Sequence, residues 1–307
     1  MTSSAGRYDG PIIDAHHHLW DATLGRHPWM TDPDSPLKAL GNIDFMRKSY
    51  LVADYLADAG AQPIVGCVFV ETGWDRSRKV DEEMRWLDGI GRPPGLAARR
   101  IAWVDLTAPD LAAALDLLAA VPDVVGVRET VRWHPDPAKA WARAGLMDEL
   151  GWRAGVALLA ARGLVLELLM NPYQSGEVAR LAGDMPGLAI VVNHCASPMD
   201  RDAEGIARWH QGLSAMAALP NVAIKLSNFA AYGPDKTLAG LRQGLMPCIE
   251  AFGPDRAMFG SDYPVGRRAL PFQDICEHFR DLVQDFTAAE QRALFHDTAQ
   301  RLYCFDL

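Results

Sequence analysis

The sequence predicts a single (β/α)8 barrel over residues 1–307, and three observations support this. Eight short apolar runs recur along the chain, and helical patterns with apolar residues at three- and four-residue spacing separate most of them. Near-continuous apolar strands that alternate with helices are typical of a parallel sheet covered on both faces. Eight such units close most simply into a barrel. An open doubly wound sheet is the alternative, but no glycine-rich fingerprint follows the first run.

The predicted elements alternate from one end of the chain to the other. The strands are Ile12–His18, Ile64–Glu71, Arg100–Leu106, Val124–Thr130, Leu164–Met170, Ala189–His194, Val222–Ser227 and Ala257–Asp262. The helices between them include Val80–Ile90, Leu111–Ala120, Ala140–Ala160, Gly176–Ala182, Ala203–Ala218 and Lys236–Phe252. The last helical region is Thr287–Cys304, because Thr287 and Glu290 have the spacing of a capping box.

The segment Asp21–Leu40 interrupts this rhythm directly after the first strand. It is too long and too rich in proline for a simple strand-to-helix turn. Two interpretations stay open: a solvated excursion, or a lid that carries His27 and Trp29 over the mouth of the barrel.

Composition excludes several classes of function. The formal charge is -9 and no basic run occurs, which argues against nucleic acid or anionic membranes as partners. Five scattered cysteines without a C-x-x-C pair suggest neither a disulfide framework nor a thiolate zinc site. No apolar run reaches the ~18 residues of a membrane span, and the first residues lack a signal-peptide pattern. We therefore expect a cytoplasmic protein with a small-molecule substrate, and a homodimer is among the assemblies left open.

Polar residues end most of the predicted strands. In a closed barrel the chemistry lies at the carboxyl ends of the strands. The residues at these ends are His16 and His18, Glu71, Arg128, His194, Lys225 and Ser227, and Asp262. Chance placement of polar residues on the surface would not put them at the ends of so many strands. The pattern therefore predicts one functional rim.

Three histidines and one aspartate form the predicted catalytic set. Side chains alternate along a strand, so His16 and His18 point one way and His17 points the other. Two such imidazoles can bind one metal ion or one polarised oxygen, and His194 can join them. Asp262 is ionised at neutral pH and can accept a proton from water as a general base. Cys195, beside His194, is expected to pack rather than to act as a nucleophile.

Charged residues near this set have both functional and structural interpretations. Arg128 suits a substrate carboxylate, or forms a buried ion pair with Glu167 or with the neighbours of Glu129. Glu71 either orients the substrate or pairs with a basic group. Lys225 is likewise a candidate for substrate binding or for a structural pair.

The remaining candidates for substrate binding follow the fourth and fifth strands or lie in the long loop. They are Trp133, His134, Tyr173 and Trp29, with Asn171 as a further residue of the pocket. His210, His278 and His296 lie in helical patterns and carry no predicted role.

Several motifs resemble a known family. The motifs are the opening Ile13–Asp21, Val70-Glu71, Gly126–Arg128 with Trp133–Pro137, Asn193-His194 and Phe252–Val265. They resemble the amidohydrolase superfamily, in its amidohydrolase-2 branch. More narrowly they are similar to the TIM-barrel hydrolases that open sugar-acid and aromatic-pathway lactones. The resemblance covers nearly the whole chain. It implies that His16 and His18 are the first-strand pair, His194 the mid-barrel histidine and Asp262 the water-activating aspartate.

The chain departs from the family where the fuller metal sites use a further histidine or a carboxylated lysine. The fifth strand offers Leu169 and Asn171 instead, and the seventh offers Lys225. His16, His18, His194 and Asp262 could still hold one zinc or manganese ion. Lactonase-like relatives include members thought to work without a metal, so the resemblance leaves open whether an ion is bound.

The resulting hypothesis is a lactonase in which Asp262 activates water while the histidines, or an ion that they hold, polarise the ester carbonyl. The alternative from another reaction class is a metal-dependent non-oxidative decarboxylase of the same branch. A sugar-acid binding protein that has lost activity is the third interpretation. The sequence does not choose between sugar lactones and dicarboxylate lactones as substrates.

Overall fold

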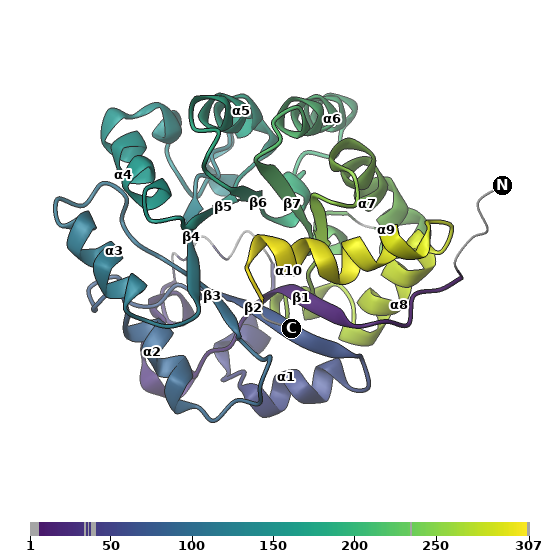
Figure 1. Cartoon of the computed structure of the whole chain (residues 1–307), viewed down its shortest axis with the longest axis horizontal. Coiled ribbons are helices and arrows are strands. Elements are labelled where there is room, and N and C mark those ends of the chain that lie inside the picture. The colour runs from purple at the N-terminus through teal and green to yellow at the C-terminus, as the bar shows by residue number, and fades with distance from the viewer. Residues whose placement is uncertain (1–5, 34, 36, 38–40, 234, 306–307) are drawn as a thin grey trace.

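The computed structural model describes residues 6–33, 35, 37, 41–233 and 235–305 and confirms the predicted barrel. Eight parallel strands neighbour one another in chain order, and helices surround them (Figure 1). The strands are β1 (Ile12–His17), β2 (Ile64–Val70), β3 (Arg99–Ala102), β4 (Val124–Thr130), β5 (Val165–Leu169), β6 (Ile190–Val192), β7 (Val222–Leu226) and β8 (Ala257–Phe259).

The α-helices of the described residues follow most of the predicted ranges. They are α1 (Val52–Ala59), α2 (Glu82–Gly89), α3 (Leu111–Ala119), α4 (Leu150–Ala160), α5 (Ser175–Asp184), α6 (Ala203–Ala217), α7 (Leu238–Phe252), α8 (Phe272–Val283), α9 (Ala288–Arg292) and α10 (Thr298–Leu302). The Thr287–Glu290 capping box is present. The predicted helix Ala140–Ala160 is wrong over its first ten residues, because Gly145 has φ of 71° and Glu149 is extended. Among the described residues, no helix is long and apolar enough to cross a membrane.

The barrel closes between its first and last strands. His17 forms a parallel bridge with Tyr263. The Asp262 amide donates to the His16 carbonyl at 2.7 Å, and the His18 amide donates to the Tyr263 carbonyl at 2.8 Å. This seam brings together the two ends of the predicted catalytic set, although His18 and Asp262 are 244 residues apart in the sequence.

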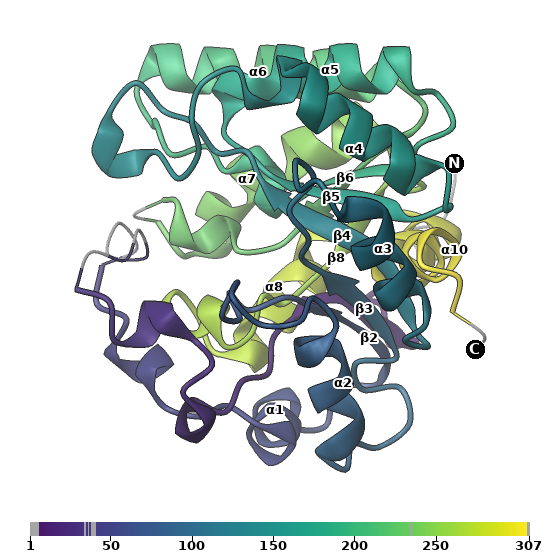
Figure 2. The ribbon, with the colours of Figure 1, turned by 90° about the vertical axis from the view of Figure 1, so that its left-hand side faces the viewer.

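Apolar side chains fill the inside of the barrel and seal one end of it. Ile13, Val68, Val191 and Met258 belong to an inner core that also contains Tyr303 of the C-terminal segment. Figure 2 shows α10 and both chain ends on one side of the molecule and the segment after β1 on the opposite side. The opposite end therefore holds the carboxyl ends of the strands, where polar side chains meet.

The segment after β1 is fastened to the end of β2. Trp29 donates its indole N–H to the Thr72 carbonyl at 2.7 Å, and His27 Nε2 lies 2.9 Å from Thr72 Oγ1. Gly73 has φ of +71°, and a Cβ there would lie 2.9 Å from Trp29. Residues 34, 36 and 38–40 of the segment Asp21–Leu40 lie outside the described residues, so the choice between a solvated excursion and a lid stays open.

Candidate active site

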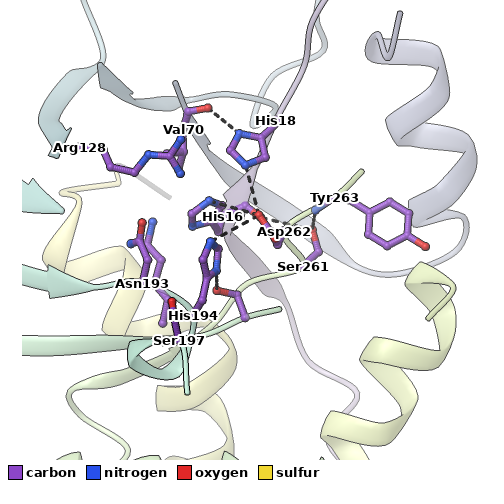
Figure 3. A network of polar contacts seen from close by, with 12 residues as sticks. His16, His18, Val70, Arg128, Asn193, His194, Ser197, Ser261, Asp262 and Tyr263 are labelled. Carbon is purple, nitrogen blue, oxygen red and sulfur yellow. Dashed lines mark hydrogen bonds and ion pairs between the residues drawn. The ribbon is translucent and has the colours of Figure 1, made fainter. Parts of the chain in front are cut away.

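Three imidazoles converge on one carboxylate oxygen at the rim of the barrel (Figure 3). Asp262 Oδ1 lies 3.2 Å from His18 Nε2, 3.4 Å from His16 Nε2 and 3.9 Å from His194 Nε2. All four side chains are buried. His17 points away and packs against Tyr55, with 4.8 Å between ring centroids, as the alternation along β1 predicts.

Hydrogen bonds fix how two of these rings are turned. His18 Nδ1 donates to the Val70 carbonyl at 2.7 Å, so a neutral His18 directs the lone pair of Nε2 at Asp262. His194 Nδ1 lies 2.8 Å from the Ser227 hydroxyl, and its Nε2 also faces Asp262. Two lone pairs that face each other repel, so the arrangement calls for a proton or a cation between the ring and the carboxylate.

Burial and charge set the protonation states of the group. Burial lowers the pKa of His194 to about 3, although the Asp262 charge opposes this shift. Burial, together with the Lys225 charge, also lowers the pKa of His16 well below its usual value. Burial alone would raise the pKa of Asp262, but His194 and His18 hold it below the ordinary range. At neutral pH the centre therefore offers neutral His16 and His194 imidazoles and one carboxylate.

Asp14 orders the backbone on both sides of this centre. Its carboxylate accepts hydrogen bonds from the Ser261 amide at 2.8 Å, the Ser261 hydroxyl at 2.6 Å and the Tyr55 hydroxyl at 2.8 Å. It also accepts one from the His16 amide at 3.2 Å. Because Ser261 precedes Asp262, this one carboxylate sets the relative position of β1 and the general-base candidate.

The loop after β6 carries His194 in a strained conformation. His194, Cys195, Ala196 and Ser197 have φ of 53°, 53°, 60° and 48°. The left-handed region costs a residue other than glycine about 1–2 kcal/mol. Trp209 Nε1 donates to the Cys195 carbonyl at 2.7 Å and helps to hold this run. Strain of this kind gathers at functional sites, and here it directs His194 at Asp262.

The donor set suits a divalent ion. Ligand atoms of His16, His194 and Asp262 all lie within 4.8 Å of one another. Within the described residues, the two ring nitrogens of His16 make no hydrogen bond, and Asp262 Oδ2 makes none either. Neutral imidazoles and a carboxylate are usual ligands of zinc. His18 Nε2, 3.2 Å from Asp262 Oδ1, is a candidate for a fourth ligand.

A cavity of about 310 Å³ opens beside this centre. Its lining includes His18, Trp29, Glu71, Arg128 and Leu169, together with Trp141. A larger cavity of about 550 Å³ lies on the flank of the barrel, between Trp74 and Leu117, and contains none of the three histidines. Through His18, the smaller cavity borders the centre formed by the three histidines and Asp262, which makes it the candidate substrate pocket.

Arg128 and Glu71 reach this cavity as an ion pair. Arg128 Nη2 lies 2.6 Å from Glu71 Oε1 and 2.7 Å from the Glu71 carbonyl oxygen. Arg76 Nη2 lies 2.9 Å from Glu71 Oε2. Burial opposes the shift, but these two guanidinium groups hold the pKa of Glu71 well below its usual value. The expected structural partners of Arg128, Glu167 and the neighbours of Glu129, are wrong.

Lys225 lies inside the barrel, below the rim. Its Nζ is 2.5 Å from Glu167 Oε1, which also accepts a hydrogen bond from the Tyr303 hydroxyl at 2.6 Å. Asn193 donates to the other oxygen of Glu167 at 2.9 Å. Both charged residues are fully buried. Lys225 is therefore engaged by Glu167, as its interpretation as a member of a structural pair predicts.

The candidates after β4 and β5 meet around Asp200, which the sequence reasoning did not single out. Asp200 lies 2.9 Å from His134 Nε2 and 2.9 Å from Lys139 Nζ, and it accepts from the Tyr173 hydroxyl at 3.0 Å. Trp133 packs edge-on against Tyr173, with 5.7 Å between ring centroids. These contacts join three loops of the rim and leave the His134 ring already bonded to a carboxylate.

Arg132 is a second residue that the sequence reasoning missed. Its side chain is 1% exposed and donates to the Ser197 and Tyr232 hydroxyls at 2.9 Å each. A usable signal was present, since positions 128, 130 and 132 share one face if the extended chain continues beyond β4.

The comparisons with known proteins agree with this geometry. A profile of the amidohydrolase family matches residues 13–305. The uncharacterised protein y4mH of Sinorhizobium fredii is 33% identical over 298 residues, which span 96% of this chain and 99% of the relative. The L-fucono-1,5-lactonase of Burkholderia multivorans is 28% identical over 307 residues, which span 95% of each chain.

Solved structures extend the likeness to three dimensions. An amidohydrolase from Burkholderia multivorans with bound HEPES has a TM-score of 0.77 at 26% identity, and the match covers 96% of this chain and 100% of the other. A structure of that amidohydrolase with bound zinc has a TM-score of 0.76 at 25% identity over the same shares. The family profile, which spans nearly the whole chain, shows that this protein belongs to the amidohydrolase family.

Proposed function

We propose that this protein is a lactonase, a hydrolase that opens a cyclic ester with water activated by Asp262. The observation that carries the proposal is the meeting of His16, His18 and His194 within 3.9 Å of one Asp262 oxygen, beside a cavity of about 310 Å³. The relatives named L-fucono-1,5-lactonase, each 28% identical, support the choice of a lactone over other esters.

The chain's own groups supply the proton transfers. Asp262 takes a proton from water while the water oxygen attacks the lactone carbonyl. The bond between the carbonyl carbon and the ring oxygen then breaks, and Asp262 returns the proton to that oxygen, which yields an open hydroxy acid. A divalent ion held by His16, His194 and Asp262, with His18 as a further ligand, would supply Lewis-acid polarisation of the carbonyl. A solved relative contains zinc, which makes zinc the first ion to test.

The cavity lining orients the lactone. Trp29 forms an apolar wall, and the Glu71–Arg128 pair presents a polar edge. Trp133, His134 and Tyr173 shape the rim through Asp200. Lys225 lies deeper in the barrel than this cavity, where its ammonium group bonds Glu167 and its charge helps to lower the pKa of His16. The protein acts on a small molecule, and cytoplasmic residence remains part of this proposal.

A panel of small lactones, read with a pH indicator because each opening releases acid, tests the proposal. Asp262→Asn should lower turnover about 10²–10⁴-fold, the usual range for loss of a general base. Asp116→Asn removes an exposed carboxylate of α3 instead and serves as the matched control. Full turnover by the Asp262 variant would refute the assigned base.

Chelation separates lactone opening from the decarboxylase alternative. A decarboxylase of this branch needs a firmly bound ion, so carbon dioxide release that stops on chelation and returns with zinc or manganese would favour it. Lactone opening without carbon dioxide release rejects it. A binding protein without activity would open no lactone and release no carbon dioxide, although it would still bind the ring-opened acid.

A further inference from the structure

Arg132 differs from the other deeply buried arginines of the described chain. Three of them each meet a carboxylate: Arg100 lies 2.6 Å from Asp88, Arg128 lies 2.6 Å from Glu71 and Arg280 lies 2.7 Å from Glu277. Arg132 is equally buried but forms no ion pair within the described residues. A buried charge without a counter-charge is strongly unfavourable, so this position calls for an explanation.

Two nitrogens of the Arg132 guanidinium and one neighbouring indole nitrogen are hydrogen-bond donors without a partner among the described residues. One nitrogen, Nη2, makes both of its bonds, to the Ser197 and Tyr232 hydroxyls. The other two, Nε and Nη1, have no acceptor among the described residues. The guanidinium lies 4.5 Å from the ring centroid of Trp141, and the indole N–H of Trp141 also lacks an acceptor. Three donors therefore gather at one place without a matching oxygen.

This cluster adjoins the catalytic centre. Trp141 lines the same cavity of about 310 Å³ as His18 and Arg128. Ser197, which accepts from Arg132, belongs to the strained run that begins at His194. Figure 3 shows Ser197 next to His194 and on the same side of the centre as Asn193. Trp141 and His18 therefore connect the Arg132 cluster and the histidine centre to one cavity, although Arg132 and Asp262 themselves lie behind its lining.

The chemistry of the donors selects the ligand. A carboxylate has two acceptor oxygens and no donor, and a guanidinium fork matches it in charge and shape. Arg128 and His134 were the first candidates for this role, but Glu71 already neutralises Arg128 and Asp200 already bonds His134. Arg76 and Arg128 share Glu71 as their counter-charge, whereas Arg132 has no carboxylate partner within the described residues.

We propose that Arg132, assisted by the indole N–H of Trp141, binds a carboxylate carried by the substrate. The lactone opened here would then be anionic, with a free carboxylate in addition to its ring ester. This inference rests on the proposed lactonase activity for its reaction but not for its binding site. Trp141 is only half-buried and covers the guanidinium, so its indole ring is the part that turns aside when the carboxylate enters.

A matched pair of lactones tests the inference. D-Glucaro-1,4-lactone carries a carboxylate where D-glucono-1,4-lactone carries a hydroxymethyl group. We expect wild-type protein to prefer the anionic lactone in kcat/KM. Arg132→Gln should lower kcat/KM for the anionic lactone about 30-fold or more and change the neutral one by less than about 3-fold. Arg180→Gln, an exposed arginine of α5, is the matched control and should change neither.

Two further variants serve if Arg132→Gln fails to fold. Trp141→Phe keeps the ring and removes only the indole N–H, and Arg132→Lys keeps the charge and removes the fork. Each should reduce activity on the anionic lactone and spare the neutral one. Equal losses on both lactones, or a wild-type preference for the neutral lactone, would overturn the inference and leave the lactonase proposal standing.

Calorimetric binding of the ring-opened acids tests the site without turnover. Glucarate, with two carboxylates, should bind at least about 10-fold more tightly than gluconate, with one, and Arg132→Gln should remove the difference. Asp262→Asn should retain it. If no lactone of the panel is opened but this binding pattern holds, the lactonase proposal fails and the Arg132 site stands. Equal binding of both acids by wild-type protein overturns the site.

Discussion

Glu129 gives a prediction about stability that can be worked from the structure. It lies on β4 and is buried, and within the part of the chain that the structure describes its carboxylate accepts only a long hydrogen bond from Trp152 Nε1 at 3.4 Å. Burial raises the pKa of Glu129 from 4.5 to about 8. That difference corresponds to about 5 kcal/mol if all of it acts on folding. Relaxation around the ionised group reduces this figure, and we expect about 2–4 kcal/mol.

The sign of the effect follows from proton linkage. The unfolded chain releases the Glu129 proton near pH 4.5, whereas the folded chain keeps it until about pH 8. The folded state therefore binds more protons between these values, and its stability falls as pH rises through this window. Above about pH 8 the full penalty is present. Glu129→Gln keeps the shape and the acceptor oxygen but removes the ionisation.

Thermal unfolding at pH 5 and pH 9 measures the difference between variant and wild type. The two proteins should melt at nearly the same temperature at pH 5. At pH 9 the variant should melt about 3–6 °C higher, from an unfolding entropy of about 2.1 cal/mol/K per residue. Glu250→Gln changes an exposed glutamate of α7 and should show no such pH dependence. The same melting difference at both pH values, or a less stable variant at pH 9, would refute the reasoning.

Three other outcomes are expected. Glu71→Gln leaves Arg128 buried without its counter-charge and should lower the free energy of unfolding by about 3–5 kcal/mol in denaturant titration. Zinc at 100 times its Kd should stabilise chelator-treated protein by about 2.7 kcal/mol, and His194→Asn should weaken this gain, as read by melting temperature. Gly244→Ala should destabilise by about 1–3 kcal/mol, because the added Cβ would lie 1.7 Å from Phe229 Cζ.

Each of these outcomes has its own control. Glu71→Gln combined with Arg128→Met removes both charges and should recover much of the lost stability. Asp116→Asn should leave the zinc response unchanged, since Asp116 is exposed on α3. Gly151→Ala in α4 meets no atom within 4 Å and should be neutral or stabilising. A Gly244 variant as stable as the Gly151 variant would contradict the packing argument.

The sequence predicts the barrel well because each buried strand appears as a short apolar run of neighbouring residues. Apolar runs mark all eight strands within a few residues, and polar residues at their ends mark the rim. The third strand ends at Ala102 rather than Leu106, and the helix predicted from Ala140 begins at Leu150. Both errors occur where the chain leaves regular structure, which apolar periodicity does not register.

Ion pairing inside the barrel could not be predicted in the same way. Arg128 and Glu71 are 57 residues apart, and Lys225 and Glu167 are 58 residues apart. Each pair forms because alternate strands of the barrel, β2 with β4 and β5 with β7, bring the two side chains to one depth, and that depth depends on the strand register. Sequence alone identifies the charged residues, but only the register decides which of them neutralise one another.

One strained run connects the two halves of the candidate site, the histidine centre and the Arg132 cluster. The run His194–Ser197 has four successive left-handed residues, a conformation that costs each about 1–2 kcal/mol. Its first residue directs an imidazole at Asp262, and its last accepts the Arg132 hydrogen bond. A relaxed turn would separate these two contacts. We therefore expect that a change which relaxes this run, such as loss of the Trp209 hydrogen bond to Cys195, weakens ester opening and carboxylate binding together.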